Sequence, residues 1–104
     1  MKVDLRTGLS ERVTDLLRAE VHRFPEVRAA YLYGSRARGD YTPQSDIDIA
    51  IDAPGMTPQN FAQLWSAIDE LPIAFPLDCV WLQALPESRL KAQVERDGRV
   101  FLNA

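Results

Sequence analysis

The segment DIDIAID, residues 46–52, alternates between two kinds of position along its whole length. Strict alternation predicts a β-strand, because successive side chains of a strand point to opposite faces of its sheet. One face would carry the three isoleucines, and the other would carry Asp46, Asp48, Ala50 and Asp52. A face made of isoleucine has to be covered by another layer, so this segment requires a small sheet with at least one layer packed on it.

Amphipathic helices are predicted on both sides of this strand. Residues 9–24 place apolar side chains on one stripe at three- and four-residue spacing, and Ser10 is a suitable N-cap. Pro25 ends the pattern, because its ring cannot continue a helix. A second helix is predicted from Pro58 to Leu71, with Thr57 as its N-cap.

Further strands and a last helix complete the pattern. Val27–Tyr33 and Phe75–Leu82 predict strands, Glu87–Arg96 predicts a short helix, and Val100–Leu102 predicts an edge strand. This order indicates an α/β or α+β fold, in which a small mixed sheet is flanked by helices. The 104 residues suit a single domain spanning 1–104, because two cores need roughly 200 residues.

Composition excludes several classes of protein. A net charge of −3 argues against a broad nucleic-acid-binding surface. Cys79 is the single cysteine, which rules out an internal disulfide and a multi-cysteine zinc site. The sequence has no run of about 18 apolar residues and no apolar segment typical of a signal peptide. We therefore expect a cytoplasmic protein that does not bind membranes.

Three aspartates lie in predicted strands, where aspartate is uncommon. Asp46 and Asp48 share one strand face, and Asp78 lies inside another apolar run that can pair beside it. Two carboxylates about 4 Å apart repel by about 4 kcal/mol at an effective dielectric of about 20, so a fold that gathers them needs a cation. Oxygen ligands without His or Cys favour Mg²⁺. The alternative is that the aspartates only form the solvent-exposed face of an amphipathic strand and bind no metal. We expect this of Asp52.

Gly34 and Ser35 follow the predicted strand Val27–Tyr33 and suggest a phosphate-binding turn. Glycine lets the backbone approach a ligand closely, and the amides and hydroxyl after it can donate to phosphate oxygens. Arg36 and Arg38 add guanidinium groups suited to phosphate. Solvated loop arginines would give the same pattern.

A Gly-Ser pair, ten intervening residues and an Asp-x-Asp strand form a combination at fixed spacing. The stretch LYGSRARGDYTPQSDIDIAI, residues 32–51, and the run LDCVWL, residues 77–82, resemble the minimal nucleotidyltransferases of the DNA polymerase β superfamily. Specifically, they resemble the MntA-type antitoxins that are paired with HEPN-domain toxins. The resemblance covers most of the chain and implies the polymerase β-like nucleotidyltransferase fold.

The resemblance also implies a role for each motif residue. The catalytic and metal-binding residues would be Asp46, Asp48 and Asp78, and Gly34 and Ser35 would bind the nucleotide. From the chemistry of its guanidinium, Arg36 is expected to be a further nucleotide-binding residue. Two Mg²⁺ ions would assist an in-line displacement at the α-phosphorus of ATP. The acceptor would be a tyrosine of the cognate HEPN ribonuclease toxin, held in a hetero-oligomer and silenced by the AMP that it receives.

Two other functions stay open at this point. The protein could neutralise a toxin by binding alone, without catalysis. It could also transfer a nucleotide to a small molecule, although the sequence has no room for the second domain that larger superfamily members use to bind an acceptor. Cys79, Trp65 and Trp81 are expected to be packing residues rather than parts of the site.

Overall fold

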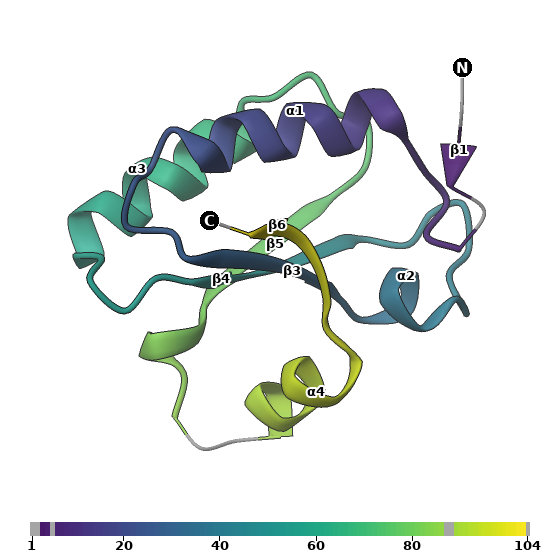
Figure 1. Cartoon of the computed structure of the whole chain (residues 1–104). Coiled ribbons are helices and arrows are strands. Elements are labelled where there is room, and N and C mark those ends of the chain that lie inside the picture. Colours follow the sequence, from purple (N-terminus) through teal and green to yellow (C-terminus); the bar gives the residue numbers. More distant parts are fainter. Residues whose placement is uncertain (1–2, 5, 87–88, 104) are drawn as a thin grey trace.

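The computed structural model describes residues 3–4, 6–86 and 89–103 of the chain, and its centre is a four-stranded sheet with the strand order β5-β4-β3-β6 (Figure 1). A separate hairpin, β1–β2, precedes it. The strands are β1 (Val3–Asp4), β2 (Leu9–Ser10), β3 (Ala29–Tyr33), β4 (Ile47–Asp52), β5 (Leu77–Trp81) and β6 (Arg99–Asn103). The helices are α1 (Glu11–His22), α2 (Ser35–Arg38), α3 (Pro58–Asp69) and α4 (Arg89–Asp97), with a 3₁₀ turn, η1, at Leu82–Ala84.

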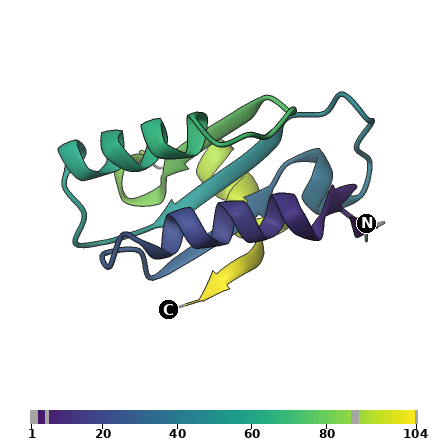
Figure 2. The same cartoon turned by 90° about the horizontal axis from the view of Figure 1, so that it is seen from above.

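The sheet is mixed, as predicted. Strand β3 pairs antiparallel with both β4 and β6, whereas β4 and β5 are parallel. Parallel neighbours need a crossover connection, and α3 provides it. Helices α1 and α3 lie side by side over one face of the sheet, and α4 lies on the other (Figures 1 and 2). The small helix-flanked sheet expected from the sequence is therefore confirmed.

The two predicted N-caps are confirmed. The Ser10 hydroxyl accepts a hydrogen bond of 3.2 Å from the backbone N–H of Val13, and α1 begins at the next residue. Thr57 accepts one of 3.1 Å from the N–H of Asn60 at the start of α3. Each hydroxyl satisfies a backbone donor that the first turn of a helix leaves without a partner.

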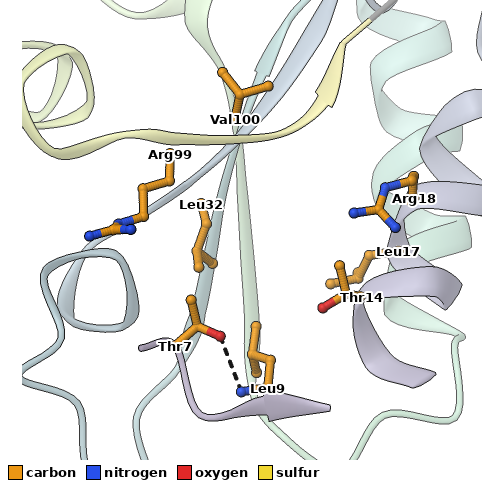
Figure 3. Close-up of a pocket in the computed structure, with 8 residues that line it drawn as sticks. All are labelled: Thr7, Leu9, Thr14, Leu17, Arg18, Leu32, Arg99 and Val100. Carbon is orange, nitrogen blue, oxygen red and sulfur yellow. Dashed lines mark hydrogen bonds between the residues drawn. The ribbon is translucent and has the colours of Figure 1, made fainter. Parts of the chain in front are cut away.

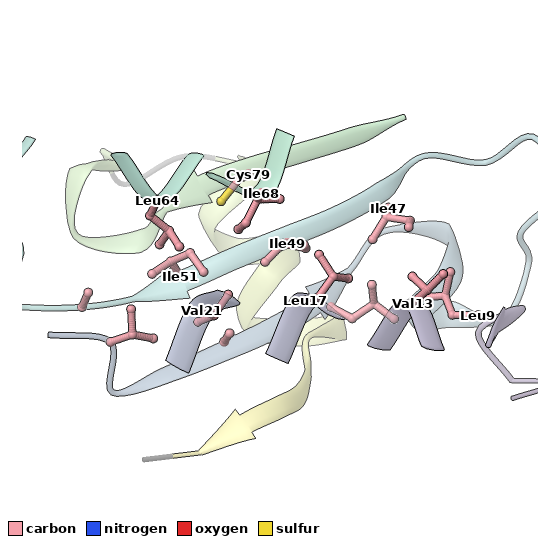
Figure 4. Close-up of a cluster of buried hydrophobic side chains, with 14 of the residues drawn as sticks. Leu9, Val13, Leu17, Val21, Ile47, Ile49, Ile51, Leu64, Ile68 and Cys79 are labelled. Carbon is pink, nitrogen blue, oxygen red and sulfur yellow. The ribbon is translucent and has the colours of Figure 1, made fainter. Parts of the chain in front are cut away.

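The isoleucine face of β4 forms the centre of the core. Ile47, Ile49 and Ile51 are fully buried and contact the apolar stripes of α1 and α3 (Figure 4). The helix residues shown in that layer are Val13, Leu17, Val21, Leu64 and Ile68. Cys79 belongs to the same cluster, and Trp65 and Trp81 pack against it. All three were expected to be packing residues. The alternation of residues 46–52 thus determines which face of the sheet is covered by α1 and α3.

Element ends differ from the sequence predictions by one to a few residues. Strand β3 begins at Ala29 rather than Val27, and β5 spans two residues fewer at its start and one fewer at its end. Helix α4 runs from Arg89, while residues 87–88 of the predicted helix lie outside the described part. The hairpin β1–β2 was not predicted, because strands of two residues are too short to show a period. Among the described residues, no helix is both long enough and apolar enough to span a membrane.

Candidate active site

The register of the sheet brings two of the predicted aspartates together. Strands β4 and β5 are parallel neighbours, and Asp48 lies directly opposite Asp78. Neighbouring strands are about 4.8 Å apart, and opposite residues of a parallel pair point to the same face. Asp46 lies two residues before Asp48, just ahead of the first residue of β4, and is exposed. The carboxylates of Asp46, Asp48 and Asp78 therefore lie at one end of the sheet, where β4 and β5 begin, and we call them the acidic edge.

The charges of both other aspartates act on the Asp48 carboxylate. Burial raises the pKa of Asp48 above its ordinary value, and the negative charges of Asp78 and Asp46 raise it further. Arg38 acts in the opposite direction. A carboxylate with two anionic neighbours binds a proton or another cation more readily than an isolated one.

The carboxylates suit a hard divalent cation, but they supply only some of the ligands that it needs. Its side-chain ligands are carboxylate oxygens, which suit Mg²⁺. Within the part of the chain that the structure describes, no three His, Cys, Asp or Glu side chains are grouped so that they could hold a metal ion by themselves. A cation between Asp48 and Asp78 would therefore need further oxygen ligands from water or from a phosphorylated substrate.

Gly34 connects the end of β3 to this acidic edge. Its φ of 75° and ψ of −155° are almost inaccessible to other residues. A Cβ at this position would overlap Oδ2 of Asp48, so the Asp48 carboxylate lies directly against the glycine backbone. The Gly34 carbonyl accepts hydrogen bonds of 3.1 Å from the N–H groups of both Ala37 and Arg38. Ser35 begins α2 and is partly exposed. The structure thus brings Gly34 and Ser35 to the end of the sheet that carries the aspartates.

Arg36 does not have the position that a nucleotide-binding side chain needs. It is 1% exposed, and its guanidinium donates to the backbone carbonyls of Ser45 and Thr7. The interpretation of Arg36 as a phosphate ligand is therefore wrong for its side chain, because its donors point into the protein. The reason is visible only in three dimensions: the first turn of α2 directs residue 36 toward the hairpin and the core.

Arg38, rather than Arg36, is the arginine whose charge acts on the acidic edge, and the sequence analysis did not distinguish the two. Its positive charge acts on Asp48. The guanidinium also pairs with Asp40 at 3.2 Å and with Asp97, at the end of α4, at 3.8 Å. Arg36 and Arg38 are two residues apart on a short helix, so they point in different directions, and only a helical reading of residues 35–38 distinguishes them.

Tyr33 is a second residue that the sequence analysis did not assign to the site. It lies opposite Asp48 on β3 and is 4% exposed. Burial raises the pKa of its phenol far above the ordinary value, and the charges of Asp78 and Asp48, with a side-chain hydrogen bond to Asp78, add to the effect. The phenol thus stays protonated beside the carboxylates, where it can donate a hydrogen bond.

Asp52 differs from its prediction. It was interpreted as a solvated residue, but it is 7% exposed at the opposite end of β4. Its carboxylate accepts hydrogen bonds from Arg28, at 2.9 and 3.1 Å, and from Gln83, at 2.6 Å. Gln83 in turn accepts one from the N–H of Ala53. These contacts connect β4 to η1 and give Asp52 a structural role.

A separate cavity of about 270 Å³ lies on the other face of the sheet (Figure 3). It is lined by Thr7, Leu9, Thr14, Leu17, Arg18, Leu32, Arg99 and Val100. Leu32 lines it, whereas its neighbour Tyr33 belongs to the opposite face. None of the aspartates of the acidic edge lines this cavity, so it is not the candidate active site.

Cys79 provides a direct test of the packing beneath the acidic edge. It is 5% exposed, and burial, with Asp78 as a further cause, raises the pKa of its thiol to about 12. Since the thiolate is the reactive form, we expect the folded protein to resist iodoacetamide at about pH 8. After denaturation, mass spectrometry should find one modified cysteine per chain, because the sequence has one. Equal labelling rates before and after denaturation would contradict this placement.

Comparison with known proteins agrees with the geometry. A protein-family model described as "Polymerase beta, Nucleotidyltransferase" matches residues 15–104, a range that contains the Gly34 turn and both acidic strands. No curated protein matches the chain.

Three solved structures show a similar fold. A toxin–antitoxin crystallised with AMP-PNP contains a chain with 25% identity and a TM-score of 0.66, and the match covers 88% of this chain and 73% of that one. A mutant MntA–HpeT toxin–antitoxin contains a chain with 26% identity and a TM-score of 0.60, and the match covers 89% of this chain and 72% of that one. The complex of the tri-AMPylated Shewanella oneidensis HEPN toxin with MNT antitoxin contains a chain with 25% identity and a TM-score of 0.53. This match covers 88% of this chain and 73% of that one.

Proposed function

The chain belongs to the polymerase β nucleotidyltransferase family, and we propose that it transfers AMP from ATP to a tyrosine hydroxyl of a HEPN-domain ribonuclease toxin, acting as the antitoxin. The observation that carries this proposal is the register pair of Asp48 and Asp78 beside the Gly34 turn. Two adjacent carboxylates lie next to a glycine whose missing side chain leaves the backbone open, and together they suit a cation and a phosphate chain.

The protein's own residues have distinct tasks in this reaction. The backbone after Gly34 and the Ser35 hydroxyl donate to the β- and γ-phosphates of ATP. Asp78 is exposed on the edge strand β5, so a partner's side chain can reach it. The acceptor oxygen forms a bond to the α-phosphorus, the bond from that phosphorus to pyrophosphate breaks, and the acceptor proton passes to Asp78.

Asp46, Asp48 and Asp78 would hold the divalent metal ions, two Mg²⁺ in our proposal. When bound, Mg²⁺ neutralises and orients the phosphates during the displacement. Burial and the negative charges of Asp78 and Asp46 raise the pKa of Asp48, and this supports the assignment because a bound cation would relieve the repulsion among the carboxylates. Phosphate oxygens and water would supply the ligands that the open carboxylate edge lacks.

A protein acceptor is supported by the structural relatives. One of them comes from a complex in which a tri-AMPylated HEPN toxin is bound to an MNT antitoxin. Another was crystallised with AMP-PNP, an analogue of ATP. We propose that this chain likewise forms a hetero-oligomer with a HEPN toxin and modifies it.

The test is a transfer assay. The protein is incubated with ATP labelled at the α-phosphate, Mg²⁺ and a HEPN-domain protein encoded beside it in the genome. We expect label on the HEPN protein, a mass increase of one or more AMP groups and loss of its ribonuclease activity. No transfer with Mg²⁺ or Mn²⁺, despite complex formation, would contradict the proposed reaction.

Two further tests separate catalysis from neutralisation by binding, and a protein acceptor from a small-molecule acceptor. If the double variant Asp46→Ala, Asp48→Ala still protects cells from the toxin as well as the wild-type protein does, then binding is sufficient and the enzymatic interpretation is unnecessary. If small molecules with hydroxyl groups gain the AMP mass and the HEPN protein does not, the acceptor class is wrong.

A further inference from the structure

Arg36 is a buried cation with an unusual set of partners. It is 1% exposed and is the largest fully buried side chain in the part of the protein that the structure describes. Its Nε and Nη2 donate to the carbonyl of Ser45 at 3.2 and 3.0 Å, and its Nη1 donates to the carbonyl of Thr7 at 2.8 Å. The guanidinium thus binds two separate backbone segments at the same time.

Two aromatic rings complete the environment of Arg36. Its guanidinium carbon lies 4.6 Å from the centroid of Phe75 and 5.2 Å from that of Tyr41. These distances are within the range of cation–π attraction. Among the described residues, no Asp or Glu forms an ion pair with it. Burying a guanidinium without a counter-ion is unfavourable unless its nitrogens find hydrogen-bond partners. Here each of the three nitrogens donates to a backbone carbonyl, and the two rings lie beside the charge.

The partners of Arg36 adjoin every part of the candidate site. Arg36 itself follows Gly34 and Ser35 in the chain. Ser45 immediately precedes Asp46, and Phe75 lies three residues before Asp78. In addition, the N–H of Ile47 donates to the carbonyl of Pro76 at 2.8 Å, which joins the entrances of β4 and β5. One side chain therefore connects the glycine turn to the two segments that lead into the acidic strands.

We infer that Arg36 is a positioning residue, which sets the distance between the Gly34–Ser35 turn and the carboxylates of Asp46 and Asp78. The guanidinium has the fixed planar fork that this requires: two donors hold one carbonyl, while the third nitrogen reaches another. The side chain acts through the backbone and does not touch the nucleotide. The catalytic consequence rests on the proposed function, whereas the structural consequence can be measured without it.

The first experiment measures local order in the ligand-free protein. In Arg36→Met, which keeps the length of the side chain without its charge or donors, we expect backbone amide exchange at Ser45 and Ile47 to rise at least about tenfold, as measured by NMR. Amides in the middle of α1, such as Leu17, should keep their wild-type protection. Arg36→Lys should show an intermediate increase, because an ammonium keeps the charge between the rings but loses the fork.

A matched control removes an arginine that also binds a backbone carbonyl. Arg12, exposed on α1, donates to the carbonyl of Pro72 at 3.3 Å. Arg12→Met should leave the exchange at Ser45 and Ile47 unchanged. If Arg36→Met raises exchange equally throughout the chain, Arg36 stabilises the whole fold and the positioning role is wrong. Unchanged exchange at both amides would also overturn it.

The second experiment measures function in the same variants. We expect Arg36→Met to lower kcat/KM for ATP by about 100-fold, the effect of misplacing groups by about 1 Å, while Arg12→Met keeps the wild-type value. If Arg36 bound phosphate directly, Arg36→Lys would restore most of the activity and amide exchange would not change. If wild-type protein neither binds ATP nor transfers AMP, the proposed function fails, and the exchange pattern still decides the positioning role.

Discussion

Replacing Asp48 with Asn will lower AMP transfer by at least about 1,000-fold, equivalent to about 4 kcal/mol of activation free energy, while the protein stays folded. Asp48 lies at the centre of the site, between Asp78 on β5 and Tyr33 on β3, and against Gly34. Asparagine keeps the shape of the side chain but loses the charge that would hold a cation. The assay is transfer of labelled AMP to the HEPN partner at saturating ATP.

Although Asp48→Asn should lose activity, its folded state should be at least as stable as that of the wild-type protein. Because the pKa of Asp48 is raised in the folded protein, ionisation of this carboxyl opposes folding at pH values above its ordinary pKa. Removing the charge eliminates the cost of burying it and its repulsion by Asp78 and Asp46. In the absence of divalent ions at about pH 7.5, the melting temperature of Asp48→Asn should equal or exceed that of the wild-type protein.

The matched control is Asp69→Asn, which removes an exposed carboxylate at the end of α3. Its transfer rate should equal the wild-type rate. Unfolding of Asp48→Asn would contradict the stability prediction. Transfer of AMP at the rate of Asp69→Asn would show that the acidic edge is not the reaction centre.

Replacing Gly34 with Ala will damage both stability and activity. A residue with a Cβ is strained at φ 75° and ψ −155°, at a cost of about 1–3 kcal/mol. For a domain of this size, each kcal/mol lowers the melting temperature by about 4–8 °C. The new methyl group would also overlap Oδ2 of Asp48 and displace that carboxylate. We therefore expect a transfer rate at least about 100-fold lower, assayed well below the melting temperature.

Gly55 provides the control for this substitution. No atom lies within 4 Å of a Cβ built on it, and its φ is not in the left-handed region. Gly55→Ala should therefore match the wild-type protein in melting temperature and transfer rate. A Gly34→Ala protein with wild-type activity would show that close approach at this turn is not needed, and that the phosphate site lies elsewhere.

Local patterns were sufficient to predict much of the fold. The alternation of residues 46–52 predicted β4 and its buried isoleucine face, and the caps at Ser10 and Thr57 predicted where α1 and α3 begin. These signals are readable because each depends on residues near one another in the chain. The bounds of the shorter elements were less accurate, since tertiary contacts determine where they end.

The candidate site was predicted only in part. Asp48 and Asp78 lie together, as their strands suggested, and Gly34 is held where its missing side chain is required. Arg36 and Asp52 were misinterpreted. Both are polar residues in turn-rich or strand-end segments, where a sequence suggests solvent, yet both are buried and satisfied by partners 9 to 31 residues away.

The sequence by itself determined the chemistry available to this protein: carboxylates on a strand, a glycine-serine turn, and arginines after it. Residue type and spacing carry that information, because side-chain periodicity is a local property of the backbone. Only the tertiary structure decided which of these groups meet. Pairing of β4 with β5 selected Asp78 as the neighbour of Asp48, and the short helix α2 directed Arg36 inward while Arg38 acts on Asp48. Such choices depend on register and packing between distant segments, which no local pattern specifies.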